Sequence, residues 1–200
     1  MIHSKHIYFI LLAAMLSSCS DNISPVDEGL SKQILHFGNG SEPQGLDPHI
    51  VTGVPEHHLL IAMCEGLTIA NPKGGENLPG VAKSWTISPD GKTYTFFLQE
   101  DAKWSNGDQL TATDFVWSWM RILTPSLGSQ YPDMLYYVKG APEYHQGLTD
   151  DFSSVGVTAV NDLELRVELT NATPFFIKLL SHYSTYPVHK DTVLKHGTID

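Results

Sequence analysis

Positive charge, cysteine and long apolar runs are all scarce in this chain of 200 residues. Only 12 Lys and Arg stand against 22 Asp and Glu, so the formal net charge is −10 at pH 7. Nucleic-acid binding depends on clustered Lys and Arg, and this balance therefore argues against a nucleic-acid partner. It also argues against polybasic attachment to anionic lipid. The ordinary consequence of such an acidic balance is solubility.

Motifs that carry enzymatic chemistry are missing as well. The sequence contains no Gly-x-Ser-x-Gly, no Ser-x-x-Lys, no Walker loop and no His-x-x-x-His. Gly38-x-Gly40 is not a dinucleotide-binding loop, because Pro43 occupies the place of the third Gly. His57 and His58 are adjacent, so on a helix they point in different directions and cannot form a paired metal site. We therefore expect no enzyme, no cofactor and no metal.

The one prominent apolar run, Ile7 to Leu16, lies near the N-terminus. About ten residues are too few to span a bilayer and are typical of a secretory signal. Leu16-Ser17-Ser18-Cys19 then resembles the bacterial lipobox, which implies cleavage after residue 18 and a diacylated Cys19. Ordinary signal cleavage that leaves Cys19 unmodified is the alternative. Removal of residues 1–18 takes away one positive charge, that of Lys5, and moves the net charge from −10 to −11.

Residues 19–32 are polar and contain Pro25 and Gly29, which suits a tether between a lipid anchor and a folded domain. Cys64 is the second of two cysteines. If Cys19 carries lipid, no intramolecular disulfide can form. Cys64 lies beside Met63 in a run predicted to be helical, so we expect a buried and unreactive thiol.

The strongest local signals lie between residues 82 and 123. Alternating side chains over residues 93–98 predict a half-buried strand, and Pro89-Asp90-Gly91 predicts a tight turn after a strand that begins at Ala82. Thr111 and Asp114 form the pattern of a capping box. The helix that follows carries a broad apolar face, composed of Phe115, Val116, Trp119, Met120, Ile122 and Leu123, and ends at Thr124-Pro125.

Other elements are predicted by weaker patterns. A second hairpin is expected from residues 155–160 and 163–169 around Asn161-Asp162. A helix capped by Thr173, with Pro174 at its first position, should place a set of apolar residues on the core, namely Phe175, Phe176, Leu179 and Leu180. Three further elements complete the prediction: a strand at 34–37, a helix at 55–67 and a short helix at 188–197.

The order of several short motifs resembles that of the family 5 solute-binding proteins. P-D-G-K, A-K-W-S-N-G and L-T-A-T-D-F-V-W-S-W follow one another between residues 89 and 119. Upstream stand N-G-S-E-x-x-x-L-D-P-H and G-V-P-E, and downstream T-P-F-F-I-K-L-L-S-H. The resemblance covers nearly all of residues 33–200. The family comprises extracytoplasmic oligopeptide, dipeptide and nickel receptors of ABC importers.

The resemblance implies a type II periplasmic-binding-protein fold, an α/β Venus flytrap whose two lobes close around a ligand. Residues 1–18 are then the signal peptide and 19–32 the tether. Residues 33–64 are the first segment of the main subdomain of lobe I, 65–189 its smaller subdomain, and 190–200 the start of the return into lobe I. Family members are much longer than this chain. The 200-residue piece is therefore expected to be an incomplete lobe I that binds peptide weakly or not at all.

The resemblance also implies ligand-facing residues. It assigns the backbone of Thr52, Gly53 and Val54 to the cleft, where it would pair with a bound peptide. Pro55 keeps the residue before it out of helical conformation, which agrees with that role, although a plain loop entering a helix would read the same way. Tyr131 matches a tyrosine that faces the ligand backbone. His182 matches a histidine near the carboxyl end of the peptide, although a lone histidine is more often structural.

The function implied is a lipid-anchored peptide receptor that delivers an oligopeptide to a membrane permease and its ATPase. Thr52 departs from the family, because close oligopeptide receptors can have an acidic residue there, and this leaves the peptide preference open. A dipeptide, nickel-chelate or cell-wall-peptide receptor is the alternative within the family. A non-transporting surface lipoprotein, acting as adhesin or peptide sensor, is the alternative from another class. An esterase or protease has no supporting motif.

Overall fold

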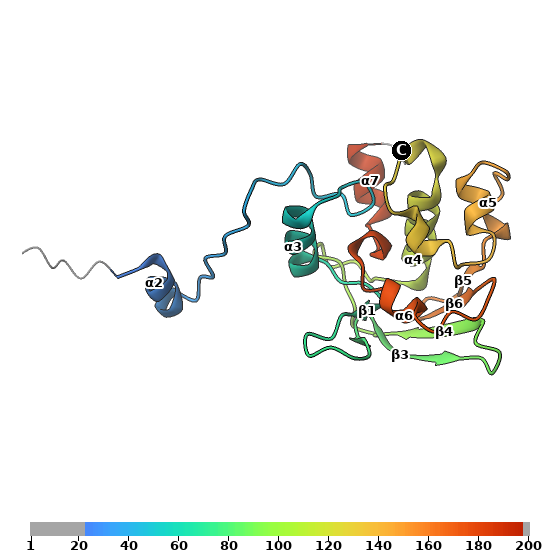
Figure 1. Ribbon diagram of the computed structural model, residues 1–200, viewed down its shortest axis with the longest axis horizontal. Coiled ribbons are helices and arrows are strands. Elements are labelled where there is room, and N and C mark those ends of the chain that lie inside the picture. The colour runs from blue at the N-terminus through green and yellow to red at the C-terminus, as the bar shows by residue number, and fades with distance from the viewer. Residues whose placement is uncertain (1–22, 198–200) are drawn as a thin grey trace, which may run out of the picture. The chain divides into compact units, whose positions relative to one another are not determined.

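A computed structural model describes residues 23–197 of the chain (Figure 1). The chain divides into two compact units, Met1–Gly40 and Ser41–Asp200. The predicted signal peptide and Cys19 lie outside the described residues. None of the helices in residues 23–197 combines the length and the apolar character needed to cross a membrane.

The first unit contains a helix where the sequence predicts only a tether. Helix α2 spans Pro25–Lys32, and the Ser24 side chain caps it by accepting a hydrogen bond from the backbone N–H of Asp27. Lys32 pairs with Glu28 at 2.6 Å, four residues back, on the exposed surface of the helix. The strand predicted at 34–37 is not formed, and no strand within residues 23–197 pairs with this segment. A strand requires a neighbouring backbone, which the apolar sequence by itself does not supply.

The second unit is built on a four-stranded antiparallel sheet with the order β3-β4-β6-β5. The strands are β3 (Ala82–Ile87), β4 (Thr93–Leu98), β5 (Val157–Asn161) and β6 (Glu164–Glu168), and β1 (Thr68–Ile69) pairs separately with β2 (Leu78–Pro79). Both predicted hairpins are therefore confirmed. In the first turn Gly91 has φ 71° and the Asp90 carboxylate accepts from the backbone N–H of Lys92 at 3.1 Å. The combination of helices with sheets agrees with the predicted α/β class.

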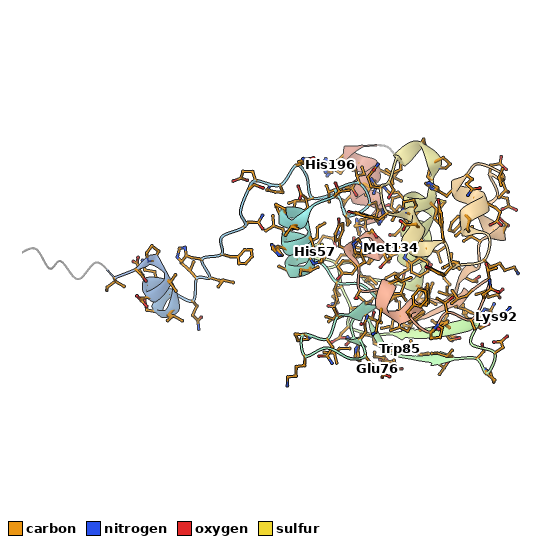
Figure 2. All side chains as sticks on the ribbon, in the orientation of Figure 1. His57, Glu76, Trp85, Lys92, Met134 and His196 are labelled. Carbon is orange, nitrogen blue, oxygen red and sulfur yellow. The ribbon has the colours of Figure 1, made fainter. Side chains whose placement is uncertain are left out.

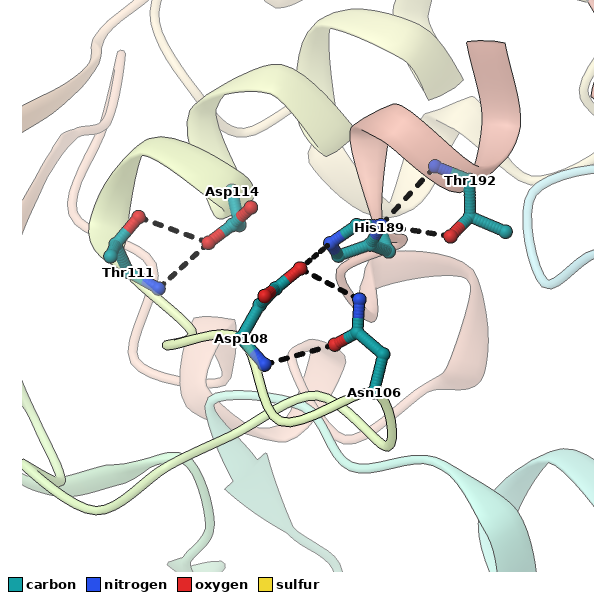
Figure 3. Close-up of polar contacts among 6 residues, drawn as sticks. All are labelled: Asn106, Asp108, Thr111, Asp114, His189 and Thr192. Carbon is teal, nitrogen blue, oxygen red and sulfur yellow. Dashed lines mark hydrogen bonds and ion pairs between the residues drawn. The ribbon is translucent and has the colours of Figure 1, made fainter. Parts of the chain in front are cut away.

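Helix α4 (Ala112–Leu123) packs on strands β5 and β6 (Figure 1). The Asp114 carboxylate accepts hydrogen bonds from the backbone N–H and the hydroxyl of Thr111, at 2.7 and 3.0 Å, and so secures the predicted start of the helix (Figure 3). Phe115 and Ile122 are fully buried against the sheet, as expected. The opposite face is buried too, with Ser118 and Arg121 exposing at most 3% of their surface, and the amphipathic pattern did not predict this.

The described part of the second unit, residues 41–197, contains four further α-helices and four 3₁₀ turns. The helices are α3 (Val54–Met63), α5 (Ala141–His145), α6 (Phe176–Leu179) and α7 (Lys190–His196). The turns are η1 (Pro125–Leu127), η2 (Pro132–Leu135), η3 (Phe152–Ser154) and η4 (Tyr183–Thr185). His189 caps α7 and contacts the Asp108 carboxylate at 3.1 Å, so this helix is tied to the loop before α4 (Figure 3).

Three local predictions were wrong in detail. Helix α6 begins at Phe176, because the Thr173 hydroxyl donates to the Asn171 carbonyl instead of capping a helix, and Phe175 is 46% exposed. Helix α3 ends at Met63 rather than near residue 67. As a result Cys64 leaves the helix and is exposed instead of buried. Partial desolvation nevertheless raises the pKa of its thiol, so exposure does not make the thiol reactive.

Candidate functional site

The loop before α3 is held in place by a buried arginine from α4. The Asp47 carboxylate receives two hydrogen bonds from the Arg121 guanidinium, at 3.0 and 2.6 Å. Arg121 is 3% exposed, whereas the Asp47 side chain keeps 35% of its surface. Burial raises the pKa of Asp47, but hydrogen bonds from Arg121 and from the backbone N–H of His49, together with the charge of Arg121, outweigh that effect and lower it.

His49 completes this network from the same loop. Its Nδ1 accepts from Arg121 at 3.0 Å, because a guanidinium can only donate, and its Nε2 therefore donates to the Tyr186 carbonyl at 3.0 Å. The ring is 1% exposed, and burial lowers its pKa to about 4. His49 is thus a neutral connector between α4 and the segment after η4. We name Asp47, His49 and Arg121 the loop clamp.

The predicted cleft segment follows directly after the loop clamp. The Tyr183 hydroxyl donates to the Val51 carbonyl at 3.1 Å, which secures the residue before it. Thr52, Gly53 and Val54 are exposed. The backbone N–H groups of Thr52 and Gly53 donate to no group within residues 23–197, and the Thr52 carbonyl accepts from none. The structure therefore presents a short, anchored stretch of backbone in which these two N–H groups and the Thr52 carbonyl are unused within the described residues.

Gly53 adopts a conformation that side chains disfavour. Its φ of 126° and ψ of 161° lie in a region that only glycine occupies readily. Helix α3 starts here, and the His57 N–H makes the first helical hydrogen bond, to the Gly53 carbonyl at 3.1 Å. Glu56 in the first turn is 3% exposed and accepts from the backbone N–H of Gln44 at 2.7 Å.

Tyr131 and His182, each predicted to face the ligand, lie side by side in the structure. Their rings meet edge-on with centroids 5.2 Å apart, and both side chains are half-buried. His182 also stacks on Tyr183 at 4.4 Å, and its Nδ1 lies 2.8 Å from the Ser184 hydroxyl. Burial, followed by the nearby His57, lowers the pKa of His182 against the opposing effect of Asp133. His182 is therefore a neutral ring on the aromatic surface beside the cleft segment.

Val51, directly before the cleft segment, and Tyr131 pack against one small apolar cluster. Leu60, Tyr183 and Tyr186 form its buried part. The predicted site residues themselves are exposed or half-buried and are not enclosed in the core. We name the set Thr52, Gly53, Val54, Tyr131 and His182 the rim.

Sequence reasoning missed most of the residues that support the rim. The L-D-P-H motif drew attention to Asp47 and His49, but their partner Arg121 lies 74 and 72 residues further on. His57 is half-buried on α3 (Figure 2). Its ring centroid lies 6.5 Å from that of His182. The buried Glu56 and Tyr183 carried no signal in the sequence that separated them from surface residues.

A cavity of about 840 Å³ is lined in part by His57, whose ring neighbours that of His182. Its lining includes the exposed apolar side of α3, with Ile61 and Met63, and Trp104 from the loop after β4. Within residues 23–197, no group of three or more His, Cys, Asp or Glu side chains is arranged to hold a metal ion.

Comparison with known proteins identifies the family of the chain. Residues 77–198 match the family model of the bacterial extracellular solute-binding proteins, family 5 Middle. The chain belongs to family 5 of the solute-binding proteins. This match includes Tyr131 and His182 of the rim, whereas the cleft segment lies upstream of it.

Relatives extend the family 5 similarity over nearly the whole chain. The periplasmic oligopeptide-binding protein OppA of Escherichia coli K12 is 41% identical over 192 residues, which is 94% of this chain and 35% of that protein. The dipeptide-binding protein of Lactococcus lactis is 38% identical over 163 residues, 82% of this chain and 29% of its own length. The crystal structure of Haemophilus influenzae OppA in complex with RPPGFSPFR matches with a TM-score of 0.74 at 40% identity, covering 78% of this chain and 31% of that one.

The family 5 chain spans about a third of the length of these relatives. The similar proteins are solute-binding receptors rather than enzymes, and they act outside the cytoplasm. The fold is that of periplasmic solute-binding proteins, of which this chain matches part.

Proposed function

We propose that this chain is part of a peptide receptor of an ABC importer, and that the rim is one wall of its peptide site. The observation that carries the proposal is the pair of backbone N–H groups of Thr52 and Gly53, unused within the described residues and directly after Val51, which packs with Tyr131 against one buried cluster. An extended peptide can join such a segment as an added strand, and main-chain hydrogen bonds then provide affinity largely independent of its sequence. The aromatic rings would border the peptide without selecting one side chain.

The membrane attachment and the partners belong to the same proposal. A diacylated Cys19 would hold the receptor on the outer side of a bacterial membrane, where the loaded form docks on its permease. The lipobox-like sequence supports this, and two signals of lipid binding are ordinarily needed for stable anchoring, which two acyl chains supply. A Cys19→Ser variant should move from the membrane fraction to the soluble fraction. An unchanged distribution would contradict the anchor.

We assign residues 33–64 to the main subdomain of lobe I, residues 65–189 to its smaller subdomain and residues 190–200 to the return into the main subdomain. The sheet and α4 all fall in the second of these segments, which supports treating it as one structural subdomain. The loop clamp then joins the two subdomains, because Asp47 and His49 come from the first segment and Arg121 from the second.

Calorimetry with a panel of dipeptides and tri- to pentapeptides tests the function. The protein at the length made by the cell should bind tri- to pentapeptides, and the same peptides with blocked backbone amides should bind more weakly because the added-strand hydrogen bonds are lost. The 200-residue chain contributes one wall only and should bind weakly or not at all. Micromolar binding by the 200-residue chain would contradict the two-walled site. Failure of the longer protein to bind any peptide would contradict the function.

A dipeptide receptor is the second candidate, favoured by the similarity to the Lactococcus lactis protein. The same peptide panel separates the two, because a dipeptide receptor should lose affinity as the peptide is lengthened.

A further inference from the structure

Glu56 is a buried carboxylate that has no cationic partner. It is 3% exposed, and no Lys, Arg or His in residues 23–197 forms an ion pair with it. An ionised carboxylate is costly to bury unless hydrogen bonds compensate it. One of its oxygens receives the backbone N–H of Gln44 at 2.7 Å. The other oxygen lies against Gly53, within the cleft segment.

The contact with Gly53 is close enough to require glycine. A Cβ atom placed on Gly53 would lie 2.5 Å from Oε2 of Glu56, in addition to the strain of a φ of 126°. The missing side chain therefore lets the carboxylate lie directly beneath the backbone of the cleft segment.

Tyr183 acts at the other end of the same segment. Its hydroxyl donates to the Val51 carbonyl at 3.1 Å, and its ring is 2% exposed. Burial, with contributions from Tyr131 and Glu56, raises the pKa of Tyr183 to about 12, so the hydroxyl remains a donor at physiological pH. Tyr183 thus contacts Val51, which precedes Thr52, and Glu56 lies against Gly53, which follows it.

We propose that Glu56 and Tyr183 are positioning residues, which bracket the cleft segment and hold its backbone in the conformation that pairs with a peptide. This inference rests on the proposed function, because the pairing is the function of the rim. Neither side chain is expected to touch the peptide. Their effect is to preorganise Thr52 and Gly53, so that less conformational freedom is lost when the ligand binds.

Three variants test the bracket in the protein at the length made by the cell. Glu56→Gln keeps the size and one acceptor oxygen, Glu56→Ala removes both contacts, and Tyr183→Phe removes only the hydroxyl. Glu76→Ala is the matched control, an exposed glutamate between β1 and β2 (Figure 2). Peptide affinity is measured by calorimetry, the unfolding midpoint by thermal denaturation, and the conformation of Gly53 by its three-bond HN–Hα coupling in NMR.

The expected pattern separates positioning from bulk stability. Glu56→Ala and Tyr183→Phe should each weaken peptide binding about fivefold, the effect of one lost hydrogen bond, and should move the Gly53 couplings toward averaged values. Glu56→Gln should stay within about twofold of the wild type, since it keeps the acceptor for Gln44. The control should change nothing. Rescue by Glu56→Gln excludes a purely electrostatic effect of Glu56, and the unfolding midpoint together with the Gly53 couplings separates lost positioning from general destabilisation.

Two results would overturn the inference. Unchanged Gly53 couplings in both Glu56→Ala and Tyr183→Phe would show that the segment needs no bracket. Averaged couplings with unchanged peptide affinity would show that the bracketed conformation does not matter for binding. If the wild type binds no peptide, the proposed function fails and the inference fails with it, while the coupling measurement still reports whether the bracket exists.

Discussion

The buried His49 makes the folded state sensitive to acid, and the structure gives both the sign and the size of the effect. Burial holds the pKa of His49 at about 4 in the folded protein, against 6.5 for an exposed imidazole. Between pH 6.5 and about 4, His49 is therefore protonated in the unfolded chain but neutral in the folded protein. The free energy of unfolding should be independent of this group above pH 6.5, fall as the pH drops through that value, and level off below about pH 4.

The magnitude follows from the separation of the two pKa values. A shift of 2.5 units, from 6.5 to about 4, corresponds to about 3 kcal/mol at 1.36 kcal/mol per unit. Asp47 adds a second loss at lower pH. Its pKa is depressed by the loop clamp, so the stability it contributes is present above its ordinary value of 3.8 and is lost below it. The two groups thus act in adjacent pH windows.

Urea denaturation between pH 4 and pH 8 measures this dependence, and His49→Gln is the informative variant. Glutamine offers an acceptor oxygen to Arg121 and a donor N–H to the Tyr186 carbonyl, but it does not titrate. The variant should lose about 3 kcal/mol of the pH dependence between 6.5 and 4. His196→Gln, at an exposed position on α7, should retain the wild-type slope. Equal slopes in His49→Gln and the wild type would refute the reasoning.

Two further predictions concern the loop clamp and the exposed thiol. Arg121→Met should lower the free energy of unfolding by about 2–3 kcal/mol. This is less than the loss expected for a fully buried ion pair, because the Asp47 carboxylate is partly exposed and regains water. Chemical denaturation at pH 7 measures the change, and a value below about 0.5 kcal/mol would contradict the prediction. Cys64 should react with iodoacetamide more slowly in the folded than in the urea-unfolded protein at neutral pH, because desolvation raises its pKa, and equal rates would contradict that cause.

Local patterns predicted the parts of the fold in which neighbouring residues determine the structure. The alternation over residues 93–98, the Pro89-Asp90-Gly91 turn and the Thr111–Asp114 cap depend on contacts a few residues apart. Predictions failed where a distant partner decides the outcome. The apolar segment 34–37 has high strand propensity but no paired strand within the described residues. The Thr173 hydroxyl donates to the Asn171 carbonyl instead of capping a helix. Thr side chains can form such local hydrogen bonds to the backbone, and the sequence does not show which one forms.

The residues of the rim were predicted from the family resemblance, whereas the buried residues that support them could not be predicted. The resemblance named Tyr131 and His182, and the structure brings their rings together. The burial of Glu56 depends on Gln44 and Gly53, and that of Arg121 on Asp47 and His49. A charged residue in a single sequence reads as solvent-facing unless its partner is known. These buried charges therefore become visible only when the chain is folded.

The loop clamp has a consequence for the order in which the protein matures. Its hydrogen bonds join residues 72 to 137 positions apart, and the bond from Tyr183 to Val51 closes a loop of 132. A chain that leaves the cytoplasm N-terminus first exposes residues 47–53 long before their partners emerge. Closing such long loops costs conformational entropy. The hydrogen bond from Tyr183 to Val51 cannot form before η4 has emerged from the membrane. The stretch proposed to pair with a peptide is therefore fixed late in folding, and until then its backbone is open to other extended chains nearby.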